Sequence, residues 1–139
     1  MRQVRGPVFE TNSSSCHSIS ICDKADVLNT LNVYKGTCHI YGGEFGWDEN
    51  TFYDAATKAS YAAVYAVLYG KQEHRDMLEK VIKEQTKAEK VKLHAENSYI
   101  DHQSLDPPAV ALSVFESEET LRNFIFNPKS YLHTDNDNH

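Results

Sequence analysis

The stretch that decides the fold is Ala55-Ala56-Thr57-Lys58-Ala59-Ser60-Tyr61-Ala62-Ala63-Val64-Tyr65-Ala66-Val67-Leu68-Tyr69-Gly70. Alanine is the strongest helix former, so the stretch predicts a long helix over 50–68 that Gly70 ends. Asp48, Asn50 and Thr51 are all candidate N-caps for this helix. Its tyrosines recur every four residues, at 61, 65 and 69, which places them on one face. That face packs in the core or forms an interface between copies of the chain.

A second helix is predicted over 72–92, because apolar residues gather on one of its sides at Leu78, Val81 and Ile82. The opposite side carries a lysine stripe, which consists of Lys80, Lys83, Lys87 and Lys90. Such a stripe is typical of a solvated face, and the alternative is a surface that docks an acidic partner or RNA.

Strands are predicted on both sides of the helices. Residues 1–9 and the alternating segment 18–22 form a hairpin around a polar loop at 10–17. Further strands are expected over 37–41, 110–115 and 130–132.

Two short helices complete the prediction. One runs over 24–31 behind a cap at Asp23, and the other starts at Ser117 and ends before Pro128. The fold class is therefore α+β: a small antiparallel sheet with two longer helices and a short C-terminal helix. Residues 1–134 are expected to form a single globular domain, and 135–139 a frayed tail.

Composition narrows the functional classes. A formal net charge of −6 over 139 residues argues against general nucleic-acid binding. Three cysteines favour free thiols in a reducing compartment over a disulfide scaffold. Neither a membrane span nor a signal peptide is recognisable, so a cytoplasmic protein with no membrane partner is expected.

The loop over 10–18 is the first candidate site. Short hydroxyl and amide side chains and small residues let backbone N–H groups converge on an anion such as phosphate. Arg2 and Arg5 precede the loop and supply positive charge. The ligand-binding residues proposed in it are Asn12, Ser13, Ser14, Ser15 and His17. The alternative is a hairpin loop whose hydroxyls satisfy their own backbone.

A glycine-rich aromatic loop over 42–47 is the second candidate. Its glycines allow close approach of a ligand, and Phe45 or Trp47 can stack on a base. Glu44 is placed to accept a hydrogen bond from an amine or a ribose hydroxyl. The alternative is an aromatic plug that closes the core.

Catalysis and metal binding have less support. Cys16 and His17 are neighbours in an extended chain and point to opposite faces, so they form no dyad. The Cys and His spacings match no structural zinc motif, and no metal or cofactor is predicted. An enzyme with His17 or His39 as base, assisted by Glu10 or Glu44, stays the lowest-ranked alternative.

The string Phe9-Glu10-Thr11-Asn12-Ser13-Ser14-Ser15-Cys16-His17-Ser18 resembles the opening of a group of small uncharacterised proteins of phages and prophages. Residues 43–47 and 126–137 are similar to two further patches of that group. The group usually has Ser or Thr where this chain has Cys16, so the position demands neither a hydroxyl nor a thiol. The resemblance implies a phage setting in the host cytoplasm and no particular reaction.

The leading hypothesis is a non-enzymatic phage accessory protein, with a counter-defence role, that binds a nucleotide or another phosphorylated small molecule through the 10–18 loop. A protein-binding inhibitor of a host enzyme is the second hypothesis, acting through the lysine stripe or the acidic segment 95–120. A small nucleotide- or protein-modifying enzyme is the third. A homo-oligomer is compatible with each.

Overall fold

The computed structural model describes residues 15–24, 27–45, 50–100 and 113–136. Its strands are β1 (Ser15–Ser20), β2 (Thr37–Tyr41), β3 (Glu44–Phe45), β4 (Asn50–Phe52), β5 (Lys90–His94), β6 (Tyr99–Ile100) and β7 (Tyr131–Asn136). Its helices are α1 (Ala55–Val64), the π-helix η1 (Tyr65–Tyr69), α2 (Gln72–Thr86), the 3-10 helix η2 (Ser113–Phe115) and α4 (Glu118–Phe126). The mixed helices and small sheets confirm the predicted α+β class.

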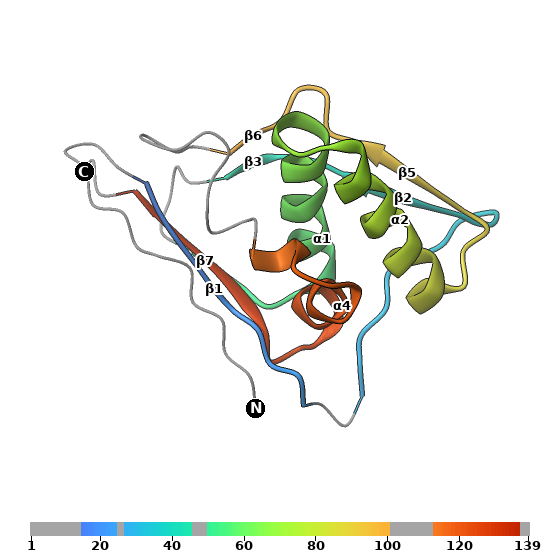
Figure 1. The fold of residues 1–139 in the computed structure, drawn as a ribbon, viewed down its shortest axis with the longest axis horizontal. Coiled ribbons are helices and arrows are strands. Elements are labelled where there is room, and N and C mark those ends of the chain that lie inside the picture. The colour runs from blue at the N-terminus through green and yellow to red at the C-terminus, as the bar shows by residue number, and fades with distance from the viewer. Residues whose placement is uncertain (1–14, 25–26, 46–49, 101–112, 137–139) are drawn as a thin grey trace.

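The strands form three small sheets around the helices (Figure 1). The antiparallel sheet has the order β1-β7-β4, and its central strand pairs Leu132 with both Ile19 and Phe52. Two parallel pairs, β2 with β5 and β3 with β6, make up the others. Because β2 and β5 flank α1 and α2 in the sequence, the helices form the crossover that a parallel pair needs.

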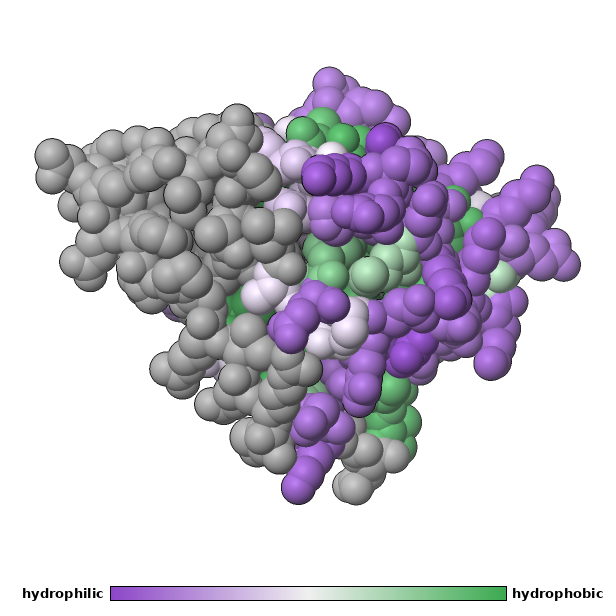
Figure 2. Space-filling model, in the orientation of Figure 1, coloured by the Kyte–Doolittle hydropathy of each residue, from purple (hydrophilic) through white to green (hydrophobic). Residues whose placement is uncertain are grey.

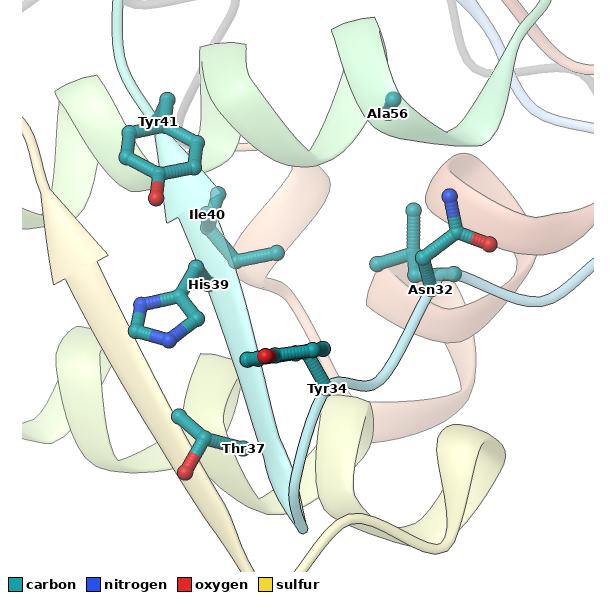
Figure 3. Close-up of a pocket in the computed structure, with 8 residues that line it drawn as sticks. Asn32, Tyr34, Thr37, His39, Ile40, Tyr41 and Ala56 are labelled. Carbon is teal, nitrogen blue, oxygen red and sulfur yellow. The ribbon is translucent and has the colours of Figure 1, made fainter.

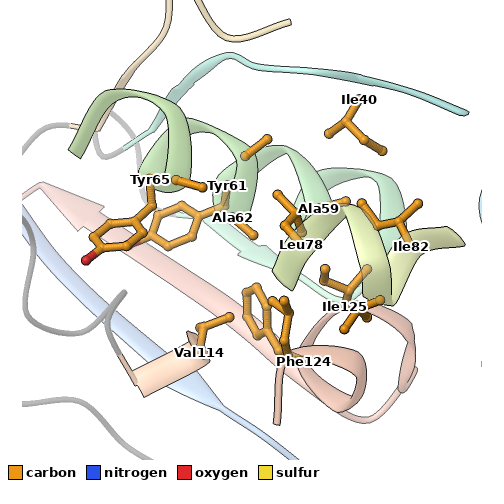
Figure 4. Close-up of a cluster of buried hydrophobic side chains, with 14 of the residues drawn as sticks. Ile40, Ala59, Tyr61, Ala62, Tyr65, Leu78, Ile82, Val114, Phe124 and Ile125 are labelled. Carbon is orange, nitrogen blue, oxygen red and sulfur yellow. The ribbon is translucent and has the colours of Figure 1, made fainter. Parts of the chain in front are cut away.

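Helix α1 is the centre of the core. Nearly every side chain over Ala55–Val64 is buried, which matches a helix that is apolar on all sides. Figure 4 shows Leu78 and Ile82 of α2, and Phe124 and Ile125 of α4, converging on this helix. Its alanines leave room for these larger side chains to approach closely.

The tyrosine stripe contributes to the core. Tyr61 and Tyr65 are buried and Tyr69 is half-buried, so packing in the core accounts for the first two. The helix continues from α1 as the π-helix η1, and the N–H of Gly70 closes it on the carbonyl of Tyr65 at 2.7 Å. Gly70 ends the helical run, as the sequence predicts.

The second helix is shorter than predicted. It ends at Thr86, because Lys87 adopts a left-handed conformation with a φ of 65° and its N–H bonds to the carbonyl of Lys83. Residues Lys90–His94 then form β5. The predicted lysine stripe is therefore wrong as a helical face, since only Lys80 and Lys83 lie on α2. Figure 2 shows that hydrophilic residues cover most of the visible described surface on the side where α2 lies.

The predicted helix over 24–31 is also wrong over its described part. The backbone of Asn29 bonds to other elements instead of its own turn: its N–H donates to the carbonyl of Phe126 at 2.7 Å, and its carbonyl accepts from Gln85 at 3.2 Å. The segment over 27–33 contains no helical residue, and these two bonds hold it against α2 and α4.

Three element boundaries need correction as well. Residues 50–52 form β4, and the cap of α1 is Asp54, whose carboxylate accepts from the N–H of Thr57 at 2.8 Å. Residues 113–115 form a 3-10 turn where a strand was predicted. Strand β1 starts at Ser15, inside the predicted 10–17 loop, and pairs with β7; residues 1–9, its expected hairpin partner, lie outside the described residues.

The predictions for the C-terminal part agree with the structure. Helix α4 starts behind Ser117, whose hydroxyl accepts from the N–H of Thr120 at 3.0 Å. The predicted last strand is β7, which continues to Asn136 and so includes the start of the predicted tail.

A buried polar latch joins α4, β1 and α1. Asn127 donates its amide to the carbonyls of Cys22 and Lys24, and Ser130 accepts from the N–H of Cys22 at 2.8 Å. The ammonium of Lys58, a fully buried residue of α1, donates to the carbonyls of Asn127 and Ser130 at 2.8 and 2.9 Å. The latch thus satisfies the buried polar groups where the three elements meet.

We expect Asn127→Ala to lower the free energy of unfolding by about 2–4 kcal/mol, because it leaves buried carbonyls without a donor. Urea unfolding measures the change. The matched control is Asn97→Ala at an exposed position, which should stay within about 0.5 kcal/mol of wild type. Equal effects of the two substitutions on the free energy of unfolding would contradict a stabilising role for the latch.

The stability of the protein should depend on pH through Lys58. Burial lowers the pKa of this ammonium from 10.5 to about 8, and the nearby Asp54 opposes the shift. Between these values the unfolded chain holds the proton more tightly, so the free energy of unfolding rises with pH. We expect a gain of about 1–2 kcal/mol between pH ~8 and ~9.5, measured by urea unfolding.

Lys58→Met should remove this rise, whatever it does to stability at neutral pH. Lys83→Met, at an exposed lysine of α2, should keep it. A wild-type slope in Lys58→Met would show that another group is responsible.

Candidate functional site: an aromatic groove beside β2

The outer face of the β2–β5 pair is polar and aromatic. Along β2, the buried residues Cys38 and Ile40 alternate with residues that reach the surface, which are Thr37, His39 and Tyr41. The outward residues of β5 are Lys90, Lys92 and His94. The parallel register sets them opposite those of β2, as the pairs Thr37↔Lys90, His39↔Lys92 and Tyr41↔His94. One strip of sheet therefore combines rings with ammonium groups.

Three rings on this face are stacked. His94 lies nearly parallel to Tyr41, with ring centroids 4.9 Å apart, and nearly parallel to His39 at 5.2 Å. Nδ1 of His39 and Nε2 of His94 are joined by a hydrogen bond of 2.9 Å. The stack is held by both strands, so the Tyr41 ring is positioned before any ligand arrives.

A tight hairpin brings a fourth ring to the same place. Lys35 and Gly36 have φ values of 51° and 79°, and two positive values in succession are typical of a type I′ turn. The N–H and carbonyl of Tyr34 pair with those of Thr37 at 2.9 and 3.0 Å. Gly36 supplies the left-handed conformation, and Lys35 places its ammonium 5.3 Å from the centre of the Tyr34 ring.

These elements enclose a groove of about 550 Å³, which is within the range of small-molecule sites (Figure 3). Its lining residues are Leu31, Asn32, Tyr34, Thr37, His39, Ile40, Tyr41 and Ala56. Tyr34 is 68% exposed and Tyr41 is 65% exposed, although tyrosine rings usually bury most of their surface. The groove thus presents two large rings to solvent.

Among the described residues, the edge of β2 that faces the groove has backbone groups with no strand partner beyond Thr37. The N–H of Gly42 donates to the carbonyl of His94, and the carbonyl of Gly36 accepts from β5. The backbone N–H and C=O groups of the even-numbered residues of β2 therefore face β5. Thr37 points the other way, to Tyr34. Because the backbone groups of successive strand residues face opposite sides, the N–H and C=O groups of His39 and Tyr41 also face away from β5. Within the described residues, no strand pairs with β2 on that side beyond Thr37.

The charges around the groove favour an anionic ligand. Lys35 is exposed on the hairpin that borders the groove, and Lys90 and Lys92 are exposed on β5, the strand on the other side of β2. The carboxylate of Glu89 lies against Gly36. This local excess of positive charge contrasts with the formal net charge of −6 of the whole chain.

The described residues among the predicted ligands do not line this groove. Arg2, Arg5, Asn12, Ser13, Ser14 and Trp47 lie outside the described residues. Ser15 and His17 belong to β1, where their backbones pair with Asn136 and Thr134 of β7. Glu44 is exposed on β3, a short distance along the chain from Tyr41.

Phe45 has a place in the core. It is 7% exposed and meets Tyr61 edge to face at 5.3 Å and Phe52 at 6.4 Å. Its ring therefore lacks the open face that stacking on a base requires, and the alternative role as an aromatic plug describes it better. The 126–131 part of the third shared patch contains the latch residues Asn127 and Ser130, so structure accounts for it.

Sequence reasoning missed the groove. Its signals were the turn-forming pair Lys35-Gly36 between Tyr34 and Thr37, and the alternation of Lys90-Val91-Lys92-Leu93-His94. The second was hidden because the lysines also fitted a helical stripe. The sequence offers His39 as a base or a metal ligand, and nothing in the sequence alone links it to His94.

Metal and thiol chemistry find little support in this region. No group of three or more His, Cys, Asp or Glu side chains is arranged for a metal ion in the part of the chain that the structure describes. Cys22 and Cys38 are free and buried, and burial raises the pKa of the Cys38 thiol. None of the described helices has the length and apolar character to cross a membrane.

Proline scanning should verify which way the β2 backbone points. Ile40→Pro removes an N–H that faces β5, so it should cost about 3 kcal/mol more than Ile40→Ala. His39→Pro removes an N–H that faces the groove, so it should lie within about 1 kcal/mol of His39→Ala. Thermal or urea unfolding of the four variants gives the comparison. If His39→Pro cost more than Ile40→Pro, each relative to its alanine variant, the open edge would belong to the even-numbered residues of β2.

Comparison with known proteins adds no assignment. No protein-family model, no curated protein and no solved structure matches the chain. The function must therefore be inferred from the geometry of the groove itself.

Proposed function

We propose that this protein binds a nucleotide in the groove beside β2 and does so without catalysing a reaction. The observation that carries the proposal is the stack of His39, His94 and Tyr41, which ends in an exposed tyrosine ring beside a groove of mononucleotide size. A nucleotide combines a flat base with an anionic phosphate, and the groove offers a complement to each.

The base would stack on the exposed tyrosines. Base–aromatic stacking contributes about 1–3 kcal/mol per base when measured by alanine substitution. Tyr41 is held against His94, so little of its side-chain entropy is lost on binding.

The phosphate would be neutralised by the surrounding lysines. Lys90 and Lys92 stand on the strand next to the stack, and Lys35 stands at the hairpin. The acidic character of the rest of the chain disfavours a long polyanion, which must cross a larger surface. A mononucleotide or another small phosphorylated ligand fits this distribution of charge better than a nucleic acid.

The predicted loop over 10–18 stays a separate hypothesis. Residues 12–14, with Arg2 and Arg5, lie outside the described residues. The phage setting that the resemblance implies suits a protein that sequesters a nucleotide signal of the host. The inhibitor hypothesis loses one of its two surfaces, because the lysine stripe is divided among α2, its cap and β5.

Calorimetric titration with a panel of nucleoside mono-, di- and triphosphates and cyclic nucleotides tests the proposal. At least one nucleotide should bind, and Tyr41→Ala and Tyr34→Ala should each weaken it about 5- to 100-fold through lost stacking. Lys92→Gln should weaken it less and reduce its salt dependence.

The matched control is Tyr53→Ala. Tyr53 is also an exposed tyrosine, 51% exposed, but it packs beside Tyr131 and does not line the groove. Its substitution should leave the affinity unchanged. The proposal fails if no nucleotide of the panel binds, or if Tyr53→Ala weakens binding as much as Tyr41→Ala does.

A further inference from the structure

We infer that the groove holds the base by its Watson–Crick edge against the open backbone edge of β2, so that only an unpaired nucleotide binds. The inference rests on the proposed function and adds to it the part of the ligand that is recognised. It starts from the backbone of His39 and Tyr41, which the stacking argument does not use.

The donors and acceptors are of the right kind. The carbonyl of His39 and the N–H of Tyr41 follow one another along the same side of β2, because both residues point away from β5. A strand edge of this kind offers an acceptor and a donor side by side, as it does to an added peptide strand. The Watson–Crick edge of each nucleobase likewise carries a donor next to an acceptor.

The walls of the groove suit a flat ring in the plane of the sheet edge. Tyr34 and Thr37 form a bridge, so the Tyr34 side chain leaves on the outer face, the side to which Tyr41 also points. Ala56 belongs to α1, which packs on the inner face where Ile40 is buried. Figure 3 shows Tyr34 and Ala56 on different sides of this space. A base that bonds the edge would lie between the tyrosine rings on the outer face and the small Ala56 on the inner face.

This arrangement excludes paired bases. A base in a duplex uses its Watson–Crick edge for its partner, so it has no donor or acceptor left for β2. The ligand class is therefore a free nucleotide or an unpaired terminal nucleotide. Base identity is read by main-chain groups, and substitutions of the His39 and Tyr41 side chains should change affinity more than base preference.

Three uridine nucleotides provide the test: UMP, N3-methyl-UMP and 5-methyl-UMP. The two methylated probes are isomers, and only the N3 methyl blocks the Watson–Crick edge. AMP and N6,N6-dimethyl-AMP form a second pair, in which the amine loses both of its hydrogens. Affinities are measured by calorimetry, and backbone amide shifts are followed by ¹⁵N-correlated NMR.

The inference predicts that N3-methyl-UMP or N6,N6-dimethyl-AMP binds at least tenfold more weakly than its parent, whereas 5-methyl-UMP stays within about threefold of UMP. The amide of Tyr41 should shift strongly with the parent nucleotide and little with the blocked one. Equal binding of parent and blocked nucleotides overturns this inference and leaves the proposed function standing. If neither UMP nor AMP binds, the base is not recognised in the way inferred; if no nucleotide of the panel binds either, the proposed function falls as well.

Discussion

The buried ammonium of Lys58 is the constraint on which the remaining architecture depends. It lies in the central helix α1 and donates to the carbonyls of Asn127 and Ser130, at the turn between α4 and β7. The same turn bonds to Cys22 and Lys24 beyond β1. A charge taken out of water is tolerated only where such partners receive it, so the position of α1 is coupled to the course of the chain where it leaves β1 and enters β7, at one end of the antiparallel sheet.

The fold class and several elements could be predicted from the sequence, because they depend on local patterns. Each of these elements satisfies its own backbone groups or buries its own apolar face. They are the alanine-rich segment, the stop at Gly70, the strand over 37–41 and the cap at Ser117. Predictions failed where the backbone finds distant partners. The helix over 24–31 is replaced by bonds from Asn29 to α4 and α2, and the end of α2 depends on one left-handed residue, Lys87.

The candidate groove escaped prediction for a related reason. Tyr41 and His94 lie far apart in the chain and are brought together by the register of β2 with β5, and the hairpin that pairs Tyr34 with Thr37 adds the Tyr34 ring. The distinctive strings of the sequence pointed elsewhere. Of these, the segment around Asn127 bonds within the core, which shows that a string can be unusual because a buried turn requires it.

The pairing of β1 with β7 determines how the molecule would respond to mechanical force. Ser15 and Asn136 are neighbours in the antiparallel register, so a pull on these two positions in opposite directions opens the strands one pair at a time. The opening runs from Ser15↔Asn136 to Ser20↔Tyr131 before it reaches the bonds of Cys22 with Ser130. The polar latch thus resists further opening. A force–extension trace should show strand separation at low force, followed by one step at higher force when the latch breaks.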